Sequence, residues 1–209
     1  TRPQEDFGTA PKLAIFLPDS SEEELNGYIR DASQGEIIQG KHKKYVNGSI
    51  LLEQDSIPIE IRLKGDWTDH LLSGNPSYRI KTASGTAFQS LRSFSVQHPR
   101  TRNNMHEWCM HELMDRADLL STRYTFLPVE INGENAGVYA LEEHFDKQLL
   151  ESRNRREGPI LKIDETGFWE LTALADLEGI DREAYPYFAP QAAIMSCFKE
   201  NRTLKSASL

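Results

Sequence analysis

The sequence has little cysteine, no long apolar run and no excess of positive charge. Its two cysteines, Cys109 and Cys197, are too few for a disulfide framework and lack the spacing of metal ligands. The longest apolar run, Leu13–Leu17, has the size of a strand, so no membrane span is expected. With 24 Lys and Arg against 32 Asp and Glu, the formal net charge of −8 argues against nucleic acid as a partner.

The composition is otherwise that of a folded globular protein. Hydrophobic residues make up 38% of the chain and charged residues 27%, which is enough for a packed core. A length of 209 residues suits one large domain or two small ones. The chain starts at Thr1 rather than Met, and residues 201–209 end it without a helix cap. We therefore interpret the sequence as a trimmed fragment of a longer protein, and such a start is consistent with the removal of a signal peptide or anchor.

Alternation of apolar and polar residues predicts a sheet of short strands. The predicted strands share this period of two and lie at 12–17, 57–64, 78–82 and 93–97. Asn47-Gly48, between Lys43–Val46 and Ser49–Glu53, predicts a type I′ hairpin turn because both residues adopt positive φ readily. A second hairpin is predicted over 125–141, with a longer loop at 132–136.

Helical patterns fall between and after these strands. The predicted helices are 20–32, opened by the capping box Ser20 and Glu23, then 102–120 and 142–150, followed by a short strand at 159–163 and helical segments at 171–177 and 189–198. The helix at 102–120 has the clearest apolar stripe, formed by Met105, Trp108, Cys109, Leu113 and Ala117. The order of elements predicts an α+β fold, an antiparallel sheet with a central helix followed by the start of a helical region.

Four cations alternate on two of the predicted strands and are the first candidates for an anion site. Arg62 and Lys64 share one face of their strand, and Arg79 and Lys81 share one face of the next. Like charges on a paired surface repel unless carboxylates or a bound phosphate lie among them. A solvated face with alternating salt bridges explains the same pattern equally well.

One carboxylate of the predicted central helix needs a partner. Glu112 lies at the edge of the apolar stripe, where an unpaired charge is costly. Its partner is either Arg116, one turn along the same helix, or a cation that reaches over from the sheet, Lys81 or Arg79.

Gly65 opens a turn-rich loop, 65–76, that could approach a ligand through its backbone N–H groups. The Walker-A and Gly-x-Gly-x-x-Gly patterns do not occur in the sequence, so this loop is only a weak indication of a phosphate-binding site. Asp69-His70 has no accompanying Gly-x-Ser-x-Gly elbow, and a hydrolase triad is not predicted. The histidines lack metal-ligand spacing, so no metal site is predicted from them.

Three segments, in this order, resemble the CotH kinase family, atypical protein kinases related to spore-coat protein H. Ile61-Arg62-Leu63-Lys64-Gly65 is similar to the family's strand ending in Arg-x-x-Gly, and Ser77-Tyr78-Arg79-Ile80-Lys81 to its following basic strand. Asn132-Gly133, with Gly137-Val138-Tyr139 and Glu143, is similar to its Asn-Gly hairpin motif, the most specific of the three. The helix start near Arg102-Asn103 also fits, and the resemblance covers about residues 57–165.

The resemblance implies a protein-kinase-like N-terminal lobe with ATP and Mg²⁺ as cofactors. In protein kinases a strand Lys holds the α- and β-phosphates and pairs with a helix Glu. By resemblance, Lys81 or its rival Arg79 is the phosphate-holding cation, and Glu112 is its partner. The loop after Gly65 would cover the phosphates, and Glu143 would lie near the hinge. The expected cofactor-binding residues are Lys81, Arg79, Glu112, Arg62, Gly65 and Glu143.

The family places its metal-binding and catalytic Asp residues in a second lobe. After residue 150 the sequence has only Asp164, Asp176 and Asp181, and none stands in an Asp-x-Asp or Trp-Asp context. Because phosphoryl transfer needs Mg²⁺ held by carboxylates, the fragment is expected to be inactive alone, with its catalytic residues unknown. The expected division is an N-terminal extension at 1–45, a CotH-like N-lobe at 46–165 and the helical start of a truncated second lobe at 166–209.

Three functions compete. The first is the nucleotide-binding part of a kinase that phosphorylates Ser or Thr of secreted or cell-surface proteins, which also implies an exported protein. The second is a CotH-like surface or coat interaction module that has lost catalysis. The third, more remote, is a carbohydrate-binding domain in which Trp67, Tyr78 and Trp169 stack on sugar.

Overall fold

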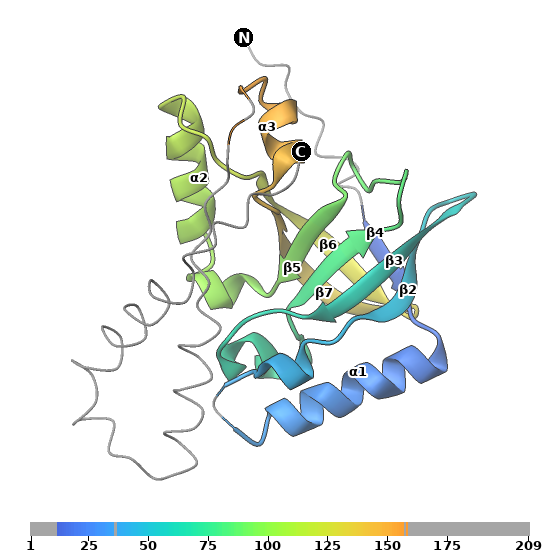
Figure 1. The fold of residues 1–209 in the computed structure, drawn as a ribbon. Helices are drawn as coiled ribbons and strands as arrows, with labels where there is room; N and C mark the ends of the chain where they lie inside the picture. The colour runs from blue at the N-terminus through green and yellow to red at the C-terminus, as the bar shows by residue number, and fades with distance from the viewer. Residues whose placement is uncertain (1–11, 36, 157, 159–209) are drawn as a thin grey trace, which may run out of the picture.

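The computed structural model describes residues 12–35, 37–156 and 158, and within them seven strands close into a β-barrel (Figure 1). The strands are β1 (Leu13–Phe16), β2 (Val46–Leu51), β3 (Ser56–Leu63), β4 (Tyr78–Thr82), β5 (Ser93–Gln97), β6 (Tyr124–Ile131) and β7 (Glu134–Glu143). Their order around the barrel is β1-β2-β3-β4-β5-β7-β6. Neighbouring strands are antiparallel except β1 and β6, whose parallel pairing closes the sheet.

The helices lie outside the barrel. They are α1 (Asp19–Ala32), α2 (His106–Arg116) and α3 (Lys147–Ser152), with short 3-10 segments η2 (Gly40–His42), η3 (Thr68–Gly74) and η4 (Pro99–Arg102). In Figure 1, α1 lies below the barrel, while α2 and α3 lie on its other side. Leu25 and Ala32 of α1 are buried and join the hydrophobic core, so this helix is packed firmly on the barrel.

The inward positions of the strands form the core. On β3, Ile59, Ile61 and Leu63 are buried, while the intervening Glu60 and Arg62 point outward. Side chains alternate between the two faces of a strand, so the alternation in the sequence fixes which residues enter the barrel. Burial of each such Ile or Leu contributes about 1.5–3 kcal/mol to folding.

The expected α+β fold with a central helix and a kinase-like N-terminal lobe is wrong. Parallel pairing of β1 with β6 closes the sheet on itself, and the barrel fills its own interior with side chains. No described residue of α2 is buried, and Met110 and Leu113 are 59% and 63% exposed. The apolar stripe of this helix therefore lies on the surface, and α2 is a peripheral helix rather than the centre of the fold.

The first predicted hairpin is also wrong. Asn47 and Gly48 lie inside β2, and the chain turns instead at 52–55, between β2 and β3. A Cβ at residue 48 would lie 2.8 Å from the Phe16 carbonyl oxygen and 2.8 Å from Leu17 Cδ2. Glycine is therefore needed at this position for close packing within the sheet rather than for a turn.

The second predicted hairpin is confirmed, with a shorter loop. Asn132 and Gly133 alone connect β6 to β7, with φ values of 50° and 83° that suit a type I′ turn. β7 then runs to Glu143, where a helix was expected, and α3 begins only after Asp146, whose carboxylate caps it. The predicted elements at 159–163, 171–177 and 189–198 lie outside the described residues.

The N-terminal segment is integrated into the barrel. The Asn132 side chain accepts a hydrogen bond from the Leu17 backbone at 2.7 Å and donates one to Glu22 at 2.7 Å, which ties the Asn-Gly turn to the start of α1. The expected domain boundaries after residues 45 and 165 stay predictions. In the part of the chain that the structure describes, no helix has the length and apolar character needed to cross a bilayer.

Candidate functional site

A row of polar side chains crosses the outer face of the barrel from β3 to β6. The strand register places neighbours of this row directly opposite one another, in the order Arg62, Arg79, Ser95, Glu142 and Tyr124. All five alternate with residues that point into the barrel. The closed sheet thus brings to one surface side chains that are up to 80 residues apart in the sequence.

A buried ion pair lies at the centre of this surface. Lys64, the residue after β3, donates a hydrogen bond to the Glu142 carboxylate and a second one, at 3.0 Å, to Oε1 of Gln97. The side chains of Lys64 and Glu142 are only 13% and 25% exposed. A desolvated ion pair is favourable only where further hydrogen bonds satisfy its partners, and Gln97 supplies one for the ammonium.

Arg79 lies beside this pair with part of its guanidinium unused. Its Nε is buried and has no hydrogen-bond partner among the described residues. Arg62, directly opposite on β3, is a second cation and donates to the Leu63 carbonyl at 2.8 Å. Burial, and then the charge of Arg62, lower the pKa of Arg79. A buried donor among like charges is an arrangement that an anion would complete.

The pKa values indicate a positive potential at this surface. Burial alone raises the pKa of Glu142, but Lys64, Arg102 and Arg79 together lower it below its ordinary value. The pKa of Lys64 is lowered as well, mainly by burial, with Arg79 and Arg102 adding to the effect. Because the neighbouring cations outweigh the effect of burial on the pKa of Glu142, positive charge dominates around this carboxyl, and such a site attracts anions.

Helix α2 meets the row from one side. The ring of His111 stacks on Tyr124 with centroids 5.3 Å apart and an interplanar angle of 13°. Arg102, at the end of η4, places its Nε 2.9 Å from Oε2 of Glu107 on α2. The candidate site therefore comprises Lys64, Arg79, Gln97, Arg102, Tyr124 and Glu142, with α2 along one border.

The structure does not bring Lys81 and Glu112 together. Lys81 is exposed, and its Nζ lies 4.4 Å from the centroid of the Tyr45 ring, which the guanidinium of Arg62 also approaches at 5.3 Å. Glu112 is half-buried on α2. Among the described residues it forms no ion pair with Lys81 or with Arg116. The roles expected of both residues in cofactor binding stay predictions.

Gly65 lies directly after Lys64 and is needed for the packing of its loop. Its φ is +104°, and a Cβ here would lie 2.2 Å from Cδ2 of His70. The His70 ring is buried, and its Nδ1 lies 2.9 Å from the hydroxyl of Ser77. The loop after β3 is thus held by contacts within itself, and an approach of its backbone to a phosphate stays a prediction.

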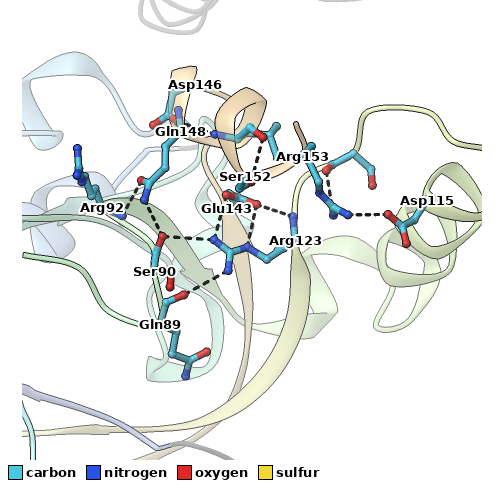
Figure 2. A network of polar contacts seen from close by, with 12 residues as sticks. Gln89, Ser90, Arg92, Asp115, Arg123, Glu143, Asp146, Gln148, Ser152 and Arg153 are labelled. Carbon is cyan, nitrogen blue, oxygen red and sulfur yellow. Dashed lines mark hydrogen bonds and ion pairs between the residues drawn. The ribbon is translucent and has the colours of Figure 1, made fainter. Parts of the chain in front are cut away.

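Glu143 is held by an arginine rather than facing the polar row (Figure 2). Its buried carboxylate accepts hydrogen bonds from Nε of Arg123 at 3.1 Å, from Nη2 at 3.2 Å and from the Arg123 backbone at 3.1 Å. Arg123 also donates to the carbonyl groups of Gln89 and Ser90, so the pair joins β6, β7 and the β4–β5 loop. The role expected of Glu143 near the hinge stays a prediction.

Sequence reasoning missed Gln97, Arg102 and the pairing of Lys64 with Glu142. Lys64 was placed on the correct face of its strand, together with Arg62. Glu142 was assigned to a helix, which concealed that it shares the outward face of the sheet. Continuing the alternation of β7 as far as residue 143 would have indicated this pairing. In the described ranges, no group of three or more potential ligands could hold a metal ion.

The alternative of a carbohydrate site loses one of its three aromatic residues. Tyr78 is 5% exposed and belongs to the barrel core, so its ring is not available to stack on a sugar. Trp67 is exposed, and Trp169 lies outside the described residues.

The fold and the site define a β-barrel protein with a cation-rich polar site on its outer face. The family model described as CotH kinase protein matches residues 61–192. Because this match spans more than half of the chain, the chain belongs to the CotH family, which confirms the resemblance found in its motifs. No curated protein matches the sequence.

Proposed function

We propose that this chain is the nucleotide-binding part of a CotH-like protein kinase that phosphorylates Ser or Thr residues of secreted or surface proteins. The observation that supports this most is the buried Nε of Arg79, which has no described partner and lies beside the Lys64–Glu142 ion pair. ATP, when bound, supplies the phosphoryl group for transfer. The cations Lys64 and Arg79 of the candidate site would hold its phosphates.

The donor set suits a polyphosphate. Lys64 and Arg79 provide an ammonium and a guanidinium from adjacent strands, and Arg102 adds a third cation. Glu142 holds Lys64 in place, as a helix Glu holds the strand Lys of protein kinases. The proposal therefore assigns the phosphate contact to Lys64 and Arg79, with Lys81 as the competing assignment.

The described residues include no group of three or more potential ligands that suits Mg²⁺. Asp164, Asp176 and Asp181 lie outside the described residues. The part of the reaction that this chain supports is the binding and orientation of the nucleotide.

The test is isothermal titration calorimetry of the whole chain with ATP and with inorganic pyrophosphate. Loss of a charge-assisted hydrogen bond costs roughly tenfold or more in affinity, so Lys64→Met and Arg79→Met are expected to weaken both ligands by that factor. Lys81→Met is the matched control, since it removes an exposed cation from the same strand as Arg79 and is expected to change either affinity less than about twofold.

Two results would change the assignment. If Lys81→Met weakens binding and Lys64→Met does not, the phosphate contact belongs to Lys81. If the unaltered chain binds neither ATP nor pyrophosphate, the nucleotide-binding proposal is overturned in favour of a surface or coat interaction module.

A further inference from the structure

We propose that Gln97 and Tyr124 are positioning residues that fix the orientation of the Lys64 ammonium beside Glu142 and so present its remaining N–H to an anion. The step to anion binding rests on the proposed function. The positioning of Lys64 does not, because it is a property of the protein without a ligand.

Gln97 is buried although it lies on the outer face of β5. Its side chain is 0% exposed, and a buried amide is costly unless both of its ends form hydrogen bonds. Its oxygen accepts from Lys64 at 3.0 Å, and its nitrogen donates to the Tyr124 hydroxyl at 3.4 Å. An ammonium only donates, so the amide oxygen must face Lys64, and this fixes the orientation of the Gln97 side chain.

Tyr124 is suited to fix the other end of the amide. Burial raises the pKa of its hydroxyl to about 12, so the group is neutral and accepts the hydrogen bond from Gln97. The ring is stacked on His111 of α2, which restrains it from the other side. Contacts therefore run from α2 through Tyr124 and Gln97 to Lys64.

This arrangement leaves Lys64 with one N–H donor that the described contacts do not use. An ammonium has three N–H donors, and the described contacts use two, one to Glu142 and one to Gln97. Without the amide, the ammonium could rotate about its Cε–Nζ bond while still paired with Glu142, and its third N–H would have no fixed direction. The two acceptors, Gln97 and Glu142, together fix the orientation of the ammonium. Its third N–H then has a set direction and can bind an anion.

The charge of Lys64 responds to several neighbours. Glu142 raises its pKa, whereas Arg79 and Arg102 lower it. His70 is also within electrostatic range of Lys64. Removing the neutral acceptor Gln97 makes the ammonium harder to maintain, and replacing that acceptor with a carboxylate makes it easier. The two changes are therefore expected to move the pKa of Lys64 in opposite directions.

The first measurement is the pKa of Lys64 in the whole chain, from the NMR shifts of ¹³Cε and ¹⁵Nζ in isotope-labelled, chemically unmodified lysines. The Lys64 signal is identified by its loss in Lys64→Arg. Gln97→Leu is expected to lower the pKa of Lys64, Gln97→Glu to raise it, and Tyr124→Phe to lower it by less. Ser95→Ala, a buried neighbour on the same face of β5, is the control and is expected to leave it unchanged.

The second measurement is the affinity for inorganic pyrophosphate. Gln97→Leu and Gln97→Glu are both expected to weaken it roughly tenfold, the first by removing the acceptor that orients the Lys64 ammonium and the second by adding a negative charge. Thermal melts establish that each variant is folded. If Gln97→Leu does not fold, Tyr124→Phe, which removes only the hydroxyl, decides the question.

Movement of the Lys64 pKa in the same direction in both Gln97 variants, or no movement in either, would overturn the inference. A purely structural role would lower stability without this opposite response. If the unaltered chain binds no pyrophosphate, the proposed function fails, while the NMR comparison still decides whether Gln97 positions Lys64.

Discussion

The guanidinium of Arg123, the residue before β6, contacts both carboxylate oxygens of Glu143, the last residue of β7. Glu143 is 2% exposed in its side chain, whereas Arg123 is 38% exposed. The two partners are therefore not equivalent, because only the removal of Arg123 would leave a buried charge without its counter-ion.

This asymmetry predicts the outcome of a mutant cycle. Arg123→Met is expected to lower the free energy of unfolding by about 2 kcal/mol, less than for a fully buried pair because water can reach the site. Glu143→Gln is expected to cost less, since its amide can still meet the Arg123 backbone. Urea unfolding of both single variants and the double variant measures this, and equal costs would contradict it.

Gly65 and Gly85 provide a matched pair of glycines. Both have positive φ, but a Cβ at residue 65 would meet the His70 ring, whereas a Cβ at residue 85 meets nothing within 4 Å. Gly85→Ala is expected to lower the free energy of unfolding by roughly 1 kcal/mol through backbone strain alone. Gly65→Ala is expected to lower the free energy of unfolding clearly more. Thermal melts of both variants measure the two losses, and equal losses would contradict the packing of His70 against Gly65.

The buried His70 predicts a loss of stability in mild acid. Burial lowers the pKa of His70, so the folded chain resists a proton that the unfolded chain accepts. Stability is therefore complete above the unfolded pKa of about 6.5 and falls as the pH drops below it. His42, whose pKa burial also lowers, contributes in the same range.

The contribution of His70 is isolated by comparing thermal midpoints at pH 7.5 and 5.5. In His70→Gln the decrease between these two values is expected to be smaller than in the unaltered chain, with the part due to His42 remaining. An unchanged decrease would mean that His70 is already protonated in the folded state.

The exposure of α2 predicts that substitutions on its outer side have little effect on stability. Leu113→Glu is expected to change the free energy of unfolding by less than about 0.5 kcal/mol, as other surface substitutions do. Leu141→Ala, in the barrel core, is expected to cost about 2–5 kcal/mol. Chemical denaturation of the two variants measures the difference, and a large cost for Leu113→Glu would show that this face is covered in the folded chain.

Local patterns predicted much of the barrel, and the errors came from long-range pairing. β4 and β5 were predicted at their observed bounds, because their alternation is set by one buried face. The closure of the sheet by β1 and β6 joins residues more than a hundred positions apart and leaves no local signal. The sequence pattern of α2 is that of a buried helix, and only the closed barrel excludes it from the core.

The candidate site was predicted in part for the same reason. Arg62 and Arg79 were recognised as outward cations, and the register places them directly opposite each other. The sequence expectation for the phosphate-holding cation names Lys81 or Arg79, and it gives no signal that Lys64 is the cation next to a carboxylate. That carboxylate, Glu142, reaches Lys64 only through the ladder β4, β5, β7.

Closure also restricts how another polypeptide can be recognised. In an open sheet, the peptide groups of the outermost strands can accept an added strand, and this is a common route to both peptide capture and aggregation. The ladder from β1 round to β6 uses these groups within the molecule itself. A protein that docks on the barrel wall must therefore be recognised through side chains rather than by the addition of a strand.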